Sequence, residues 1–373
     1  MIQHWLQLSL TSGIGPILGR RMIDAAGSAE SAVQMTRREL AQIEGIGLAK
    51  AQAVADSLKV AESDAILQLS KATEHGAKII SPDDDLWPAL LKEIPAPPLI
   101  LFVMGNLEPR DLNSLGIVGS RRCSHYGREQ AERFAALLAG AGFTITSGGA
   151  RGVDSAAHRG AIVHPQGRTI AVLGSGLDVP YPPENKPLFD QIQARGALIS
   201  EFPFGTPPNA ENFPRRNRIV SGLSRGVLVI EADERSGALI TARIANEEHG
   251  RPVFALPGRV DNQMAAGPHQ LIRDGATLVT KLEDIITALD PLPDHVHQPE
   301  LFPTASEEKP AVPQGNLSDR QQLILNNIGK DPSAVDDIID KTNLPAPAVL
   351  QELTFLTLRG LLKRADGQTY VKT

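Results

Sequence analysis

The chain has 373 residues, of which 42% are hydrophobic and 21% charged, and its formal net charge is −6. This composition is typical of a globular protein, and at roughly 100–200 residues per domain the length predicts two or three domains. The acidic balance excludes a uniformly basic, histone-like protein, although a local basic patch would still bind nucleic acid. No run reaches the ~18 apolar residues of a membrane span. Met1–Trp5 does not resemble the start of a signal peptide. The single cysteine, Cys123, cannot form an internal disulfide, and we expect a cytoplasmic protein without membrane contact.

Residues 1–75 predict a small helical domain. Gly13-Ile14-Gly15-Pro16 and Gly45-Ile46-Gly47 are turn sequences, and the second leads directly into a helical stretch. This arrangement resembles a helix-hairpin-helix, in which glycine amides at a helix start bind a phosphate. The alternative is that both are turns between packed helices, which suits the net acidic charge of the segment. Residues 76–112 predict a connector that ends in a strand at Leu99–Val103.

Residues 113–290 alternate between short β-branched runs and helical stretches. Helices are expected at Tyr126–Ala141, Gly152–Val163 and Ser236–Gly250. Continuous apolar strands between helices predict a parallel sheet covered on both faces. The fold class is therefore α/β, a Rossmann-like, doubly wound, mostly parallel sheet. The expected strands are Leu115–Val118, Phe143–Thr146, Thr169–Leu173, Ala197–Ser200, Gly226–Ile230, Pro252–Leu256 and Thr277–Val279.

Residues 291–315 predict a proline-rich linker, and residues 316–373 predict a winged-helix domain. Ser318 caps the first expected helix. Helices at Val335–Thr342 and Ala346–Leu358 follow, and Leu361–Val371 reads as a ribbon that turns at Asp366-Gly367. Residues 313–373 carry seven basic and seven acidic side chains. This balance, with the many apolar residues of Ala346–Leu358, favours a partner-binding or regulatory role over a main DNA contact.

The loops that follow the predicted strands are the candidate site, because ligands of open α/β sheets bind outside the carboxyl ends of the strands. Backbone amides, small hydroxyls and arginines bind phosphate, and several such loops along one edge favour a polymer over a single nucleotide. Of the 19 basic residues in 113–290, 17 are arginine, the side chain best suited to forked phosphate contacts. The candidate DNA-binding residues are Gly119, Ser120, Arg121, Arg122, Ser147, Gly148, Gly149, Arg151, Gly174, Ser175, Gly176, Asn212, Phe213, Arg215, Arg216, Asn217, Arg218, Ser236 and Gly237.

Each of these signals has a structural alternative. Glycines at strand–helix junctions also serve turn geometry alone, the arginines of 215–218 also suit a solvated helix start, and Phe213 also suits the core. Asp154 and His158 are spaced as an acid–base pair, but a buried orienting hydrogen bond is the favoured interpretation. Cys123 has no His–acid partner pattern and is expected to be inert.

The motifs of common cofactor and metal sites are missing from the sequence. There is no Gly-x-x-x-x-Gly-Lys-[Ser/Thr] run, and Gly174-Ser175-Gly176 lacks the third glycine of a dinucleotide fingerprint. The His/Cys cluster expected for zinc is absent too. We therefore expect no cofactor, no metal and no catalytic residue.

Five motifs, in this order and spacing, resemble the DprA/Smf family of DNA-processing proteins over about residues 80–290. These motifs are Val118–Arg122, Ser147–Asp154 with His158, Ala171–Asp178 with Tyr181-Pro182, Phe213–Ser224, and Glu231-Ala232 with Ser236-Gly237.

The resemblance implies a homodimer that binds incoming single-stranded DNA in natural transformation, protects it and helps to load the RecA recombinase. By position, Arg121 would hold a phosphate, and Gly148, Gly149 and Arg151 would cradle the backbone. Phe213 would lie near a base, with Arg215, Asn217 and Arg218 beside it.

One departure from the family pattern concerns the basic pocket. Some members carry a lysine three residues before the phenylalanine, where this chain has Ala210. Arg216 is the candidate replacement for that charge.

Two other functions stay open on the sequence alone. The core is similar to that of nucleoside-monophosphate phosphoribohydrolases. Such enzymes use a glycine-rich loop with an acidic residue, and here Glu231 precedes Ser236-Gly237-Ala238. The chain lacks their Pro-Gly-Gly-x-Gly-Thr signature, and release of free base would reveal the activity. The third interpretation is a sequence-specific regulator that acts through the winged helix.

Overall fold

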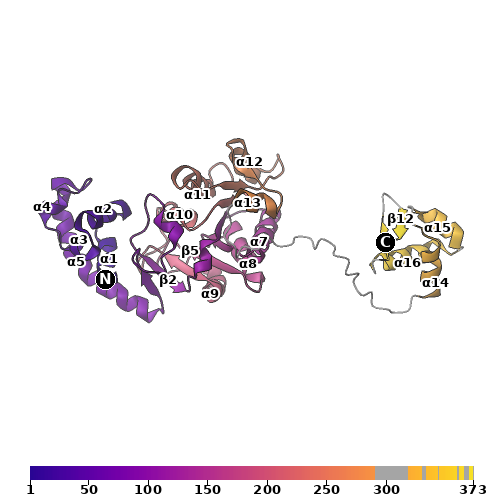
Figure 1. The fold of residues 1–373 in the computed structure, drawn as a ribbon, viewed down its shortest axis with the longest axis horizontal. Coiled ribbons are helices and arrows are strands. Elements are labelled where there is room, and N and C mark those ends of the chain that lie inside the picture. Colours follow the sequence, from indigo (N-terminus) through magenta and orange to yellow (C-terminus); the bar gives the residue numbers. More distant parts are fainter. Residues whose placement is uncertain (290–317, 330–332, 343, 359–360, 365–368, 373) are drawn as a thin grey trace. The chain divides into compact units, whose positions relative to one another are not determined.

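The computed structural model describes residues 1–289, 318–329, 333–342, 344–358, 361–364 and 369–372 (Figure 1). The chain divides into two compact units, Met1–Leu301 and Phe302–Thr373. The predicted linker, 291–315, and the predicted turn Asp366-Gly367 lie outside the described residues. The predicted domain boundaries stay a prediction.

The first unit begins with a helical region. Thr36 and Glu39 form a capping box at the start of α4, and Gly27, with a φ of 84°, ends α2. Gln68 of α5 exchanges two hydrogen bonds with the main chain of Phe204, at 3.2 and 2.8 Å. Trp5 shares one buried cluster with residues of the sheet, so these helices pack on the rest of the unit. Their bounds are α1 Ile2–Leu10, α2 Pro16–Ala26, α3 Ala29–Val33, α4 Arg37–Leu40 and α5 Gly47–Glu74.

Within the described residues, nine strands of this unit form one sheet in the order β1-β2-β6-β5-β4-β3-β7-β8-β9. All neighbours from β6 to β9 pair in parallel, whereas β2 is antiparallel to β6 and β1 is antiparallel to β2. The strands are β1 Lys78–Ile80, β2 Leu101–Gly105, β3 Ser114–Val118, β4 Thr144–Ser147, β5 Arg168–Val172, β6 Ala197–Ser200, β7 Val227–Val229, β8 Val253–Ala255 and β9 Thr277–Leu278. The Rossmann-like, mostly parallel sheet is confirmed. The strand expected in the connector is β2, which joins this sheet. β1 was not predicted from the sequence, because its three residues are too few to show an alternation of polar and apolar side chains.

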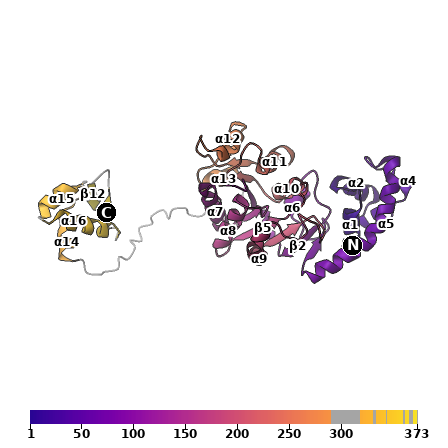
Figure 2. The same ribbon diagram turned by 180° about the vertical axis from the view of Figure 1, so that it is seen from behind.

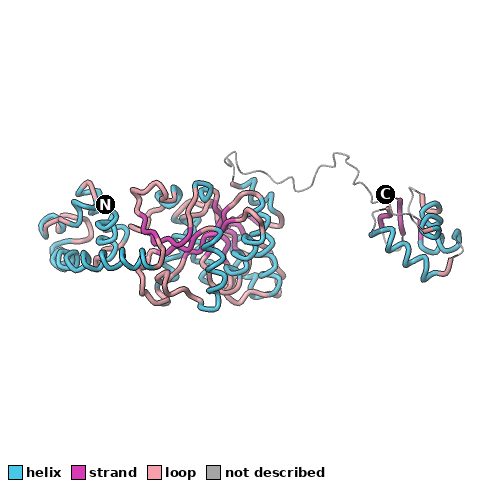
Figure 3. The backbone as a smooth tube through the Cα atoms, turned by 90° about the horizontal axis from the view of Figure 1, so that it is seen from below, coloured by secondary structure: helices cyan, strands magenta, loops and turns pink. Residues whose placement is uncertain are grey.

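Helices cover both faces of the sheet because alternate strand residues point to opposite sides. Leu228 of β7 belongs to the buried cluster that contains α7, α8 and α13, whereas Val227 and Val229 belong to the cluster that contains α10 and α11. Figures 2 and 3 show the strands in the interior of this unit with helices around them. The remaining helices are α6 Ala89–Lys92, α7 His125–Gly140, α8 Val153–Val163, α9 Lys186–Arg195, α10 Asn212–Gly222, α11 Gly237–Arg243, α12 Ala266–Arg273 and α13 Leu282–Ala288, with short 3-10 turns at η1 Pro109–Leu112, η2 Pro183–Asn185 and η4 Gln263–Ala265 and a π-helical segment at η3 Ile244–Glu248.

The second unit has its own core. Ile338, Leu353 and Leu356 are completely buried in it. Ser318 caps its first helix as predicted, in a capping box with Gln321. Its described elements are α14 Asp319–Asn326, β10 Ser333–Ala334, α15 Val335–Thr342, α16 Ala346–Leu358, β11 Leu362–Arg364 and β12 Thr369–Lys372, with the strands paired in the order β10-β12-β11. The winged-helix fold is confirmed.

Candidate nucleic-acid interface

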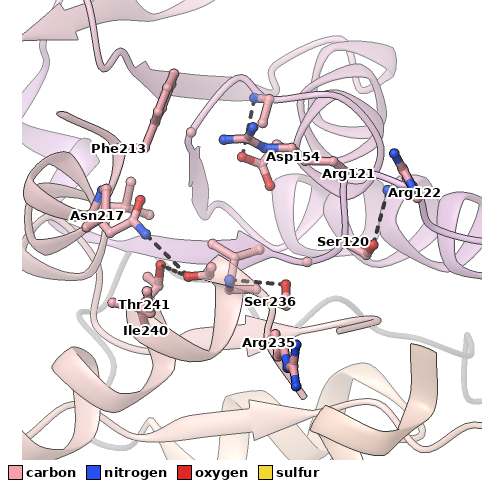
Figure 4. A pocket seen from close by; sticks show the side chains of 18 of the residues that line it. Ser120, Arg121, Arg122, Asp154, Phe213, Asn217, Arg235, Ser236, Ile240 and Thr241 are labelled. Carbon is pink, nitrogen blue, oxygen red and sulfur yellow. Dashed lines mark hydrogen bonds between the residues drawn. The ribbon is translucent and has the colours of Figure 1, made fainter. Parts of the chain in front are cut away.

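A pocket of about 890 Å³ lies outside the carboxyl ends of β3 and β7 (Figure 4). β3 is the point at which the strand order reverses, because β4 pairs with one side of it and β7 with the other. Such a switch point opens a crevice between the diverging loops, where open α/β sheets bind their ligands. Ten predicted residues line this pocket, namely Gly119, Ser120, Arg121, Arg122, Gly148, Phe213, Arg216, Asn217, Ser236 and Gly237.

Arginines and aromatic rings form one side of the pocket. The guanidinium carbon of Arg121 lies 5.0 Å from the centroid of the Phe213 ring. The Tyr181 ring lies 5.9 Å from that of Phe213, and Arg151 lies 5.7 Å from Tyr181. Phe213 is half-buried and Arg121 is exposed. A half-buried ring beside an exposed cation is suited to a base and its phosphate. Tyr181 was not among the predicted site residues, although it belongs to the motif with Pro182.

The floor of the pocket contains Arg216 and Asp154. Arg216 is 3% exposed, and its Nη1 donates to the carbonyl of Val172. Burial lowers the pKa of Arg216 to about 10 and raises the pKa of Asp154, and in each case the charge of the other group opposes the shift. A Cβ at Gly148 would lie 2.1 Å from Nη1 of Arg216, so glycine is required for this close packing. Arg216 is thus buried against the loop that contains Gly148. It does not present an exposed charge that would replace the lysine missing at Ala210.

Arg218 does not line the pocket. It forms an ion pair with Glu201 at 2.5 Å, and the two side chains are 14% and 8% exposed. Breaking one partner of such a pair leaves a buried charge, so Arg218 has a structural role. Arg215 is exposed and lies 5.5 Å from the Phe202 ring. Contact of either arginine with DNA stays a prediction.

Several predicted polar residues bond within the fold. Ser147 donates to the carbonyl of Ile117 at 2.6 Å, Ser175 to that of Val179 at 2.7 Å, and Asn212 to that of Pro207 at 3.3 Å. Like Gly149, Arg151, Gly174 and Gly176, they do not line the large pocket, and Arg151, paired with Glu184, lines a small adjoining cavity. Gly149 has a φ of 67°, which explains its glycine by backbone geometry. Part of the sequence signal therefore reflects loop packing.

The possible catalytic groups have hydrogen-bond partners within the fold. His158 contacts Thr169 at 2.6 Å between Nδ1 and Oγ1, and burial lowers its pKa to about 3. Asp154 accepts from the Ala150 amide at 3.3 Å, so the two residues bond to different partners, and the bond of His158 is the buried one. Glu231 does not line the pocket, and its carboxylate accepts from Ser124 and Asn262.

Cys123 and Arg235 also lie in loops at this edge, the first between β3 and α7 and the second between β7 and α11. Burial raises the pKa of the Cys123 thiol, which disfavours a reactive thiolate. Arg235 lines the pocket and is exposed. It was not predicted, although its position beside the predicted Ser236-Gly237 loop was a usable signal.

The described part of the chain contains no helix with the length and apolar character of a membrane span. In the same residues, no group of three or more His, Cys, Asp or Glu side chains is arranged to hold a metal ion.

Comparison with known proteins identifies the family. Residues 78–290 match the family model of DNA recombination-mediator protein A, and residues 308–368 match the DprA winged helix domain. The chain belongs to the DNA recombination-mediator protein A family. Protein Smf of Synechocystis sp. is 35% identical over 395 residues, which cover 98% of each chain. Protein Smf of Escherichia coli is 40% identical over 328 residues, 87% of this chain and 84% of its own.

Two solved structures of the family are similar. DNA processing protein A of Streptococcus pneumoniae has a TM-score of 0.67 at 34% identity, over 77% of this chain and 97% of its own. DNA processing protein A of Helicobacter pylori, described with a single-stranded DNA binding mode, has a TM-score of 0.51 at 29% identity, over 57% of this chain and 95% of its own. The predicted DprA/Smf resemblance is therefore confirmed.

Proposed function

We propose that this protein binds single-stranded DNA in the pocket at the switch point. The observation that carries the proposal is the exposed Arg121 stacked on the half-buried Phe213 at the pocket wall. Every base has a face that stacks on an aromatic ring, and a guanidinium binds any backbone phosphate, so this pair would bind DNA without strong sequence preference. An unpaired base can turn into the pocket, whereas a base within a duplex is held by its partner and its neighbours.

The biological role extends this binding activity. We infer that the protein protects incoming single-stranded DNA in natural transformation and helps to load the RecA recombinase, acting as a cytoplasmic homodimer. Membership of the family supports this role, as do the names of relatives such as the DNA processing protein DprA of Streptococcus pneumoniae, 44% identical over 207 residues.

A binding role without catalysis is supported by Glu231. Most enzymes that hydrolyse a glycosidic bond place carboxyl groups beside the sugar, and Glu231 is the residue that the sequence offered for this role. Glu231 is 2% exposed, and its carboxylate accepts hydrogen bonds from Ser124 at 2.7 Å and from Asn262 at 3.1 Å. Incubation with nucleoside monophosphates should therefore release no free base.

The test is a fluorescence anisotropy titration of one labelled oligonucleotide as a single strand and as a blunt duplex. The single strand should bind more tightly, and log Kd should rise with log salt concentration by about 0.7 for each phosphate neutralised. Equal or tighter binding of the duplex would overturn the proposal.

A further inference from the structure

The pocket continues beyond the predicted loops onto a second side. This side comes from the segment between β7 and α11, from α11 itself and from η4, and Figure 4 shows Arg235, Ser236 and Ile240 across from Arg121 and Arg122. Apart from Ser236 and Gly237, its residues were not predicted from the sequence. They are Asp233, Arg235, Ala238, Ile240, Thr241, Gln263 and Met264.

Arg235 is an available cation on this side. Within the described residues its side chain has no hydrogen bond or ion pair, although it lines the pocket. Its amide donates to Oδ1 of Asp233 at 2.9 Å, which fixes the turn and occupies one oxygen of that carboxylate. Arg243, on α11, is different because it pairs with Glu247 at 3.3 Å and with Glu248 at 3.8 Å and does not line the pocket.

Apolar and amide side chains line the same side of the pocket as Arg235. Ile240 is 37% exposed although it is a large aliphatic residue, and both Ile240 and Met264 line the pocket. The carbonyl of Met264 accepts from the Ala232 amide at 2.8 Å, which anchors η4 to the end of β7. Gln263 is exposed, and its side-chain amide both donates and accepts hydrogen bonds. An aliphatic surface, an amide and a cation together match the three parts of a nucleotide that need binding: base face, base edge and phosphate.

We propose that this second side binds a further nucleotide of the same DNA strand, with Arg235 on its phosphate and Ile240 and Met264 against its base. The inference rests on the proposed function. It extends the strand across the switch point, from the Arg121–Phe213 side to the α11 side. The volume of about 890 Å³ is near the upper end for small-ligand pockets, which gives room for more than one nucleotide.

The experiment compares Arg235→Ala with the matched control Arg243→Ala, using labelled oligothymidylate of about 12 nucleotides, a length within the usual range for such sites. Arg235→Ala should weaken binding about tenfold at low salt, the effect of one charge-assisted hydrogen bond. It should also lower the slope of log Kd against log salt by about 0.7, the contribution of one phosphate. Arg243→Ala should change neither quantity, and the thermal midpoint should stay constant in both variants.

A second variant and a shorter ligand separate the parts of the inference. Ile240→Ser should weaken binding of the same oligonucleotide without changing the salt slope, because it removes a base contact and no charge. Oligothymidylate of about 3 nucleotides, bound by the Arg121 side, should bind wild-type protein and Arg235→Ala equally.

The inference is wrong if Arg235→Ala keeps the affinity and slope of wild type while Arg121→Ala loses binding; the proposed function then survives. Equal losses for Arg235→Ala and Arg243→Ala would also overturn it, because they would indicate a diffuse effect of charge. If wild-type protein fails to bind any single strand, the proposed function and this inference both fail.

Discussion

Arginines at the two edges of the central sheet have opposite environments. At the amino edge, Arg168 of β5 is 6% exposed in its side chain and pairs with Glu108 at 2.7 Å and Asp111 at 2.9 Å. At the carboxyl edge, Arg121 and Arg122 are exposed, and the described residues provide no ion pair to either. An arginine whose charge is already balanced by carboxylates stabilises the fold, whereas one without such partners has its donors available for a ligand.

The comparison is not simply one of position. Arg218 belongs to a predicted loop at the carboxyl edge. Its buried ion pair with Glu201 nevertheless gives it an environment like that of Arg168 at the amino edge. The following predictions test whether pairing, more than position, decides the role of each arginine.

The largest effect is expected for Arg168→Ala. Because Asp111 would keep a buried charge without its partner, the free energy of unfolding should fall by roughly 3–5 kcal/mol, measured by urea denaturation. Arg110→Ala is the control, since Arg110 pairs with Glu108 at an exposed position and should cost about 1 kcal/mol or less. Similar losses of unfolding free energy in the two variants would mean that the buried and the exposed ion pairs do not differ in their contribution to stability.

Arg218→Ala should destabilise the fold by about 3 kcal/mol, because Glu201 would be left buried and unpaired. The double variant Arg218→Met with Glu201→Gln should recover part of this loss in the same urea experiment. If Arg218→Ala instead keeps the unfolding free energy of wild type and loses DNA binding, the role of Arg218 follows from its position at the carboxyl edge and not from its ion pair. Arg218 then belongs to the DNA interface.

Arg121→Ala should weaken single-stranded DNA binding by about 1–3 kcal/mol, the range for a charge-assisted hydrogen bond, with little change in the thermal midpoint. Arg133→Ala is the matched control, because Arg133 is also exposed and stacks on a phenylalanine, Phe134, at 5.7 Å, but outside the pocket. Normal binding by Arg121→Ala would mean that the site is misplaced.

Buried histidine should make stability depend on pH. His158 titrates at about 3 in the folded protein because burial disfavours its charge, against an ordinary value of 6.5. Between these values the unfolded chain binds one more proton, so stability falls as pH falls through this window. The loss is about 1.4 kcal/mol per pH unit at most. Urea midpoints measured from pH 7 to pH 5 should therefore decline less steeply in His158→Gln. His125→Gln is the control for the substitution itself, since the side chain of His125 is 91% exposed. Parallel profiles for wild type and His158→Gln would contradict the assignment.

The smallest effect is expected from deletion of residues 313–373. The second unit has its own buried core, and its sequence carries balanced charge, so single-stranded DNA binding should change by less than about 1.4 kcal/mol. Titration of a fluorescent oligonucleotide with both proteins measures this. A loss beyond about tenfold in a truncated protein that remains folded would make the winged helix a main DNA contact.

The sequence by itself predicted most strands of the central sheet and the edge at which the candidate site lies. Runs of apolar residues between helical stretches predicted the strands of a parallel sheet, and parallel strands bring the loops at their carboxyl ends to one side. Local patterns were strong enough to predict α15 and α16 with the bounds that the structure has, Val335–Thr342 and Ala346–Leu358. Loops such as that of Arg121 could be placed because chain direction alone decides their edge.

Only the tertiary structure decided which arginines of the candidate site are exposed. Arg215, Arg216 and Arg218 are neighbours in the sequence, but helix α10 points them in different directions, and the first is exposed while the second is buried. Arg218 meets Glu201 across 17 positions of sequence, and Arg168 meets Asp111 across 57. Pairs separated in this way depend on how strands and helices come together, and local composition carries no record of them. Arg235 differs from these pairs, because it directly precedes the predicted Ser236-Gly237 loop in the sequence, and the structure added that it is exposed and lines the pocket.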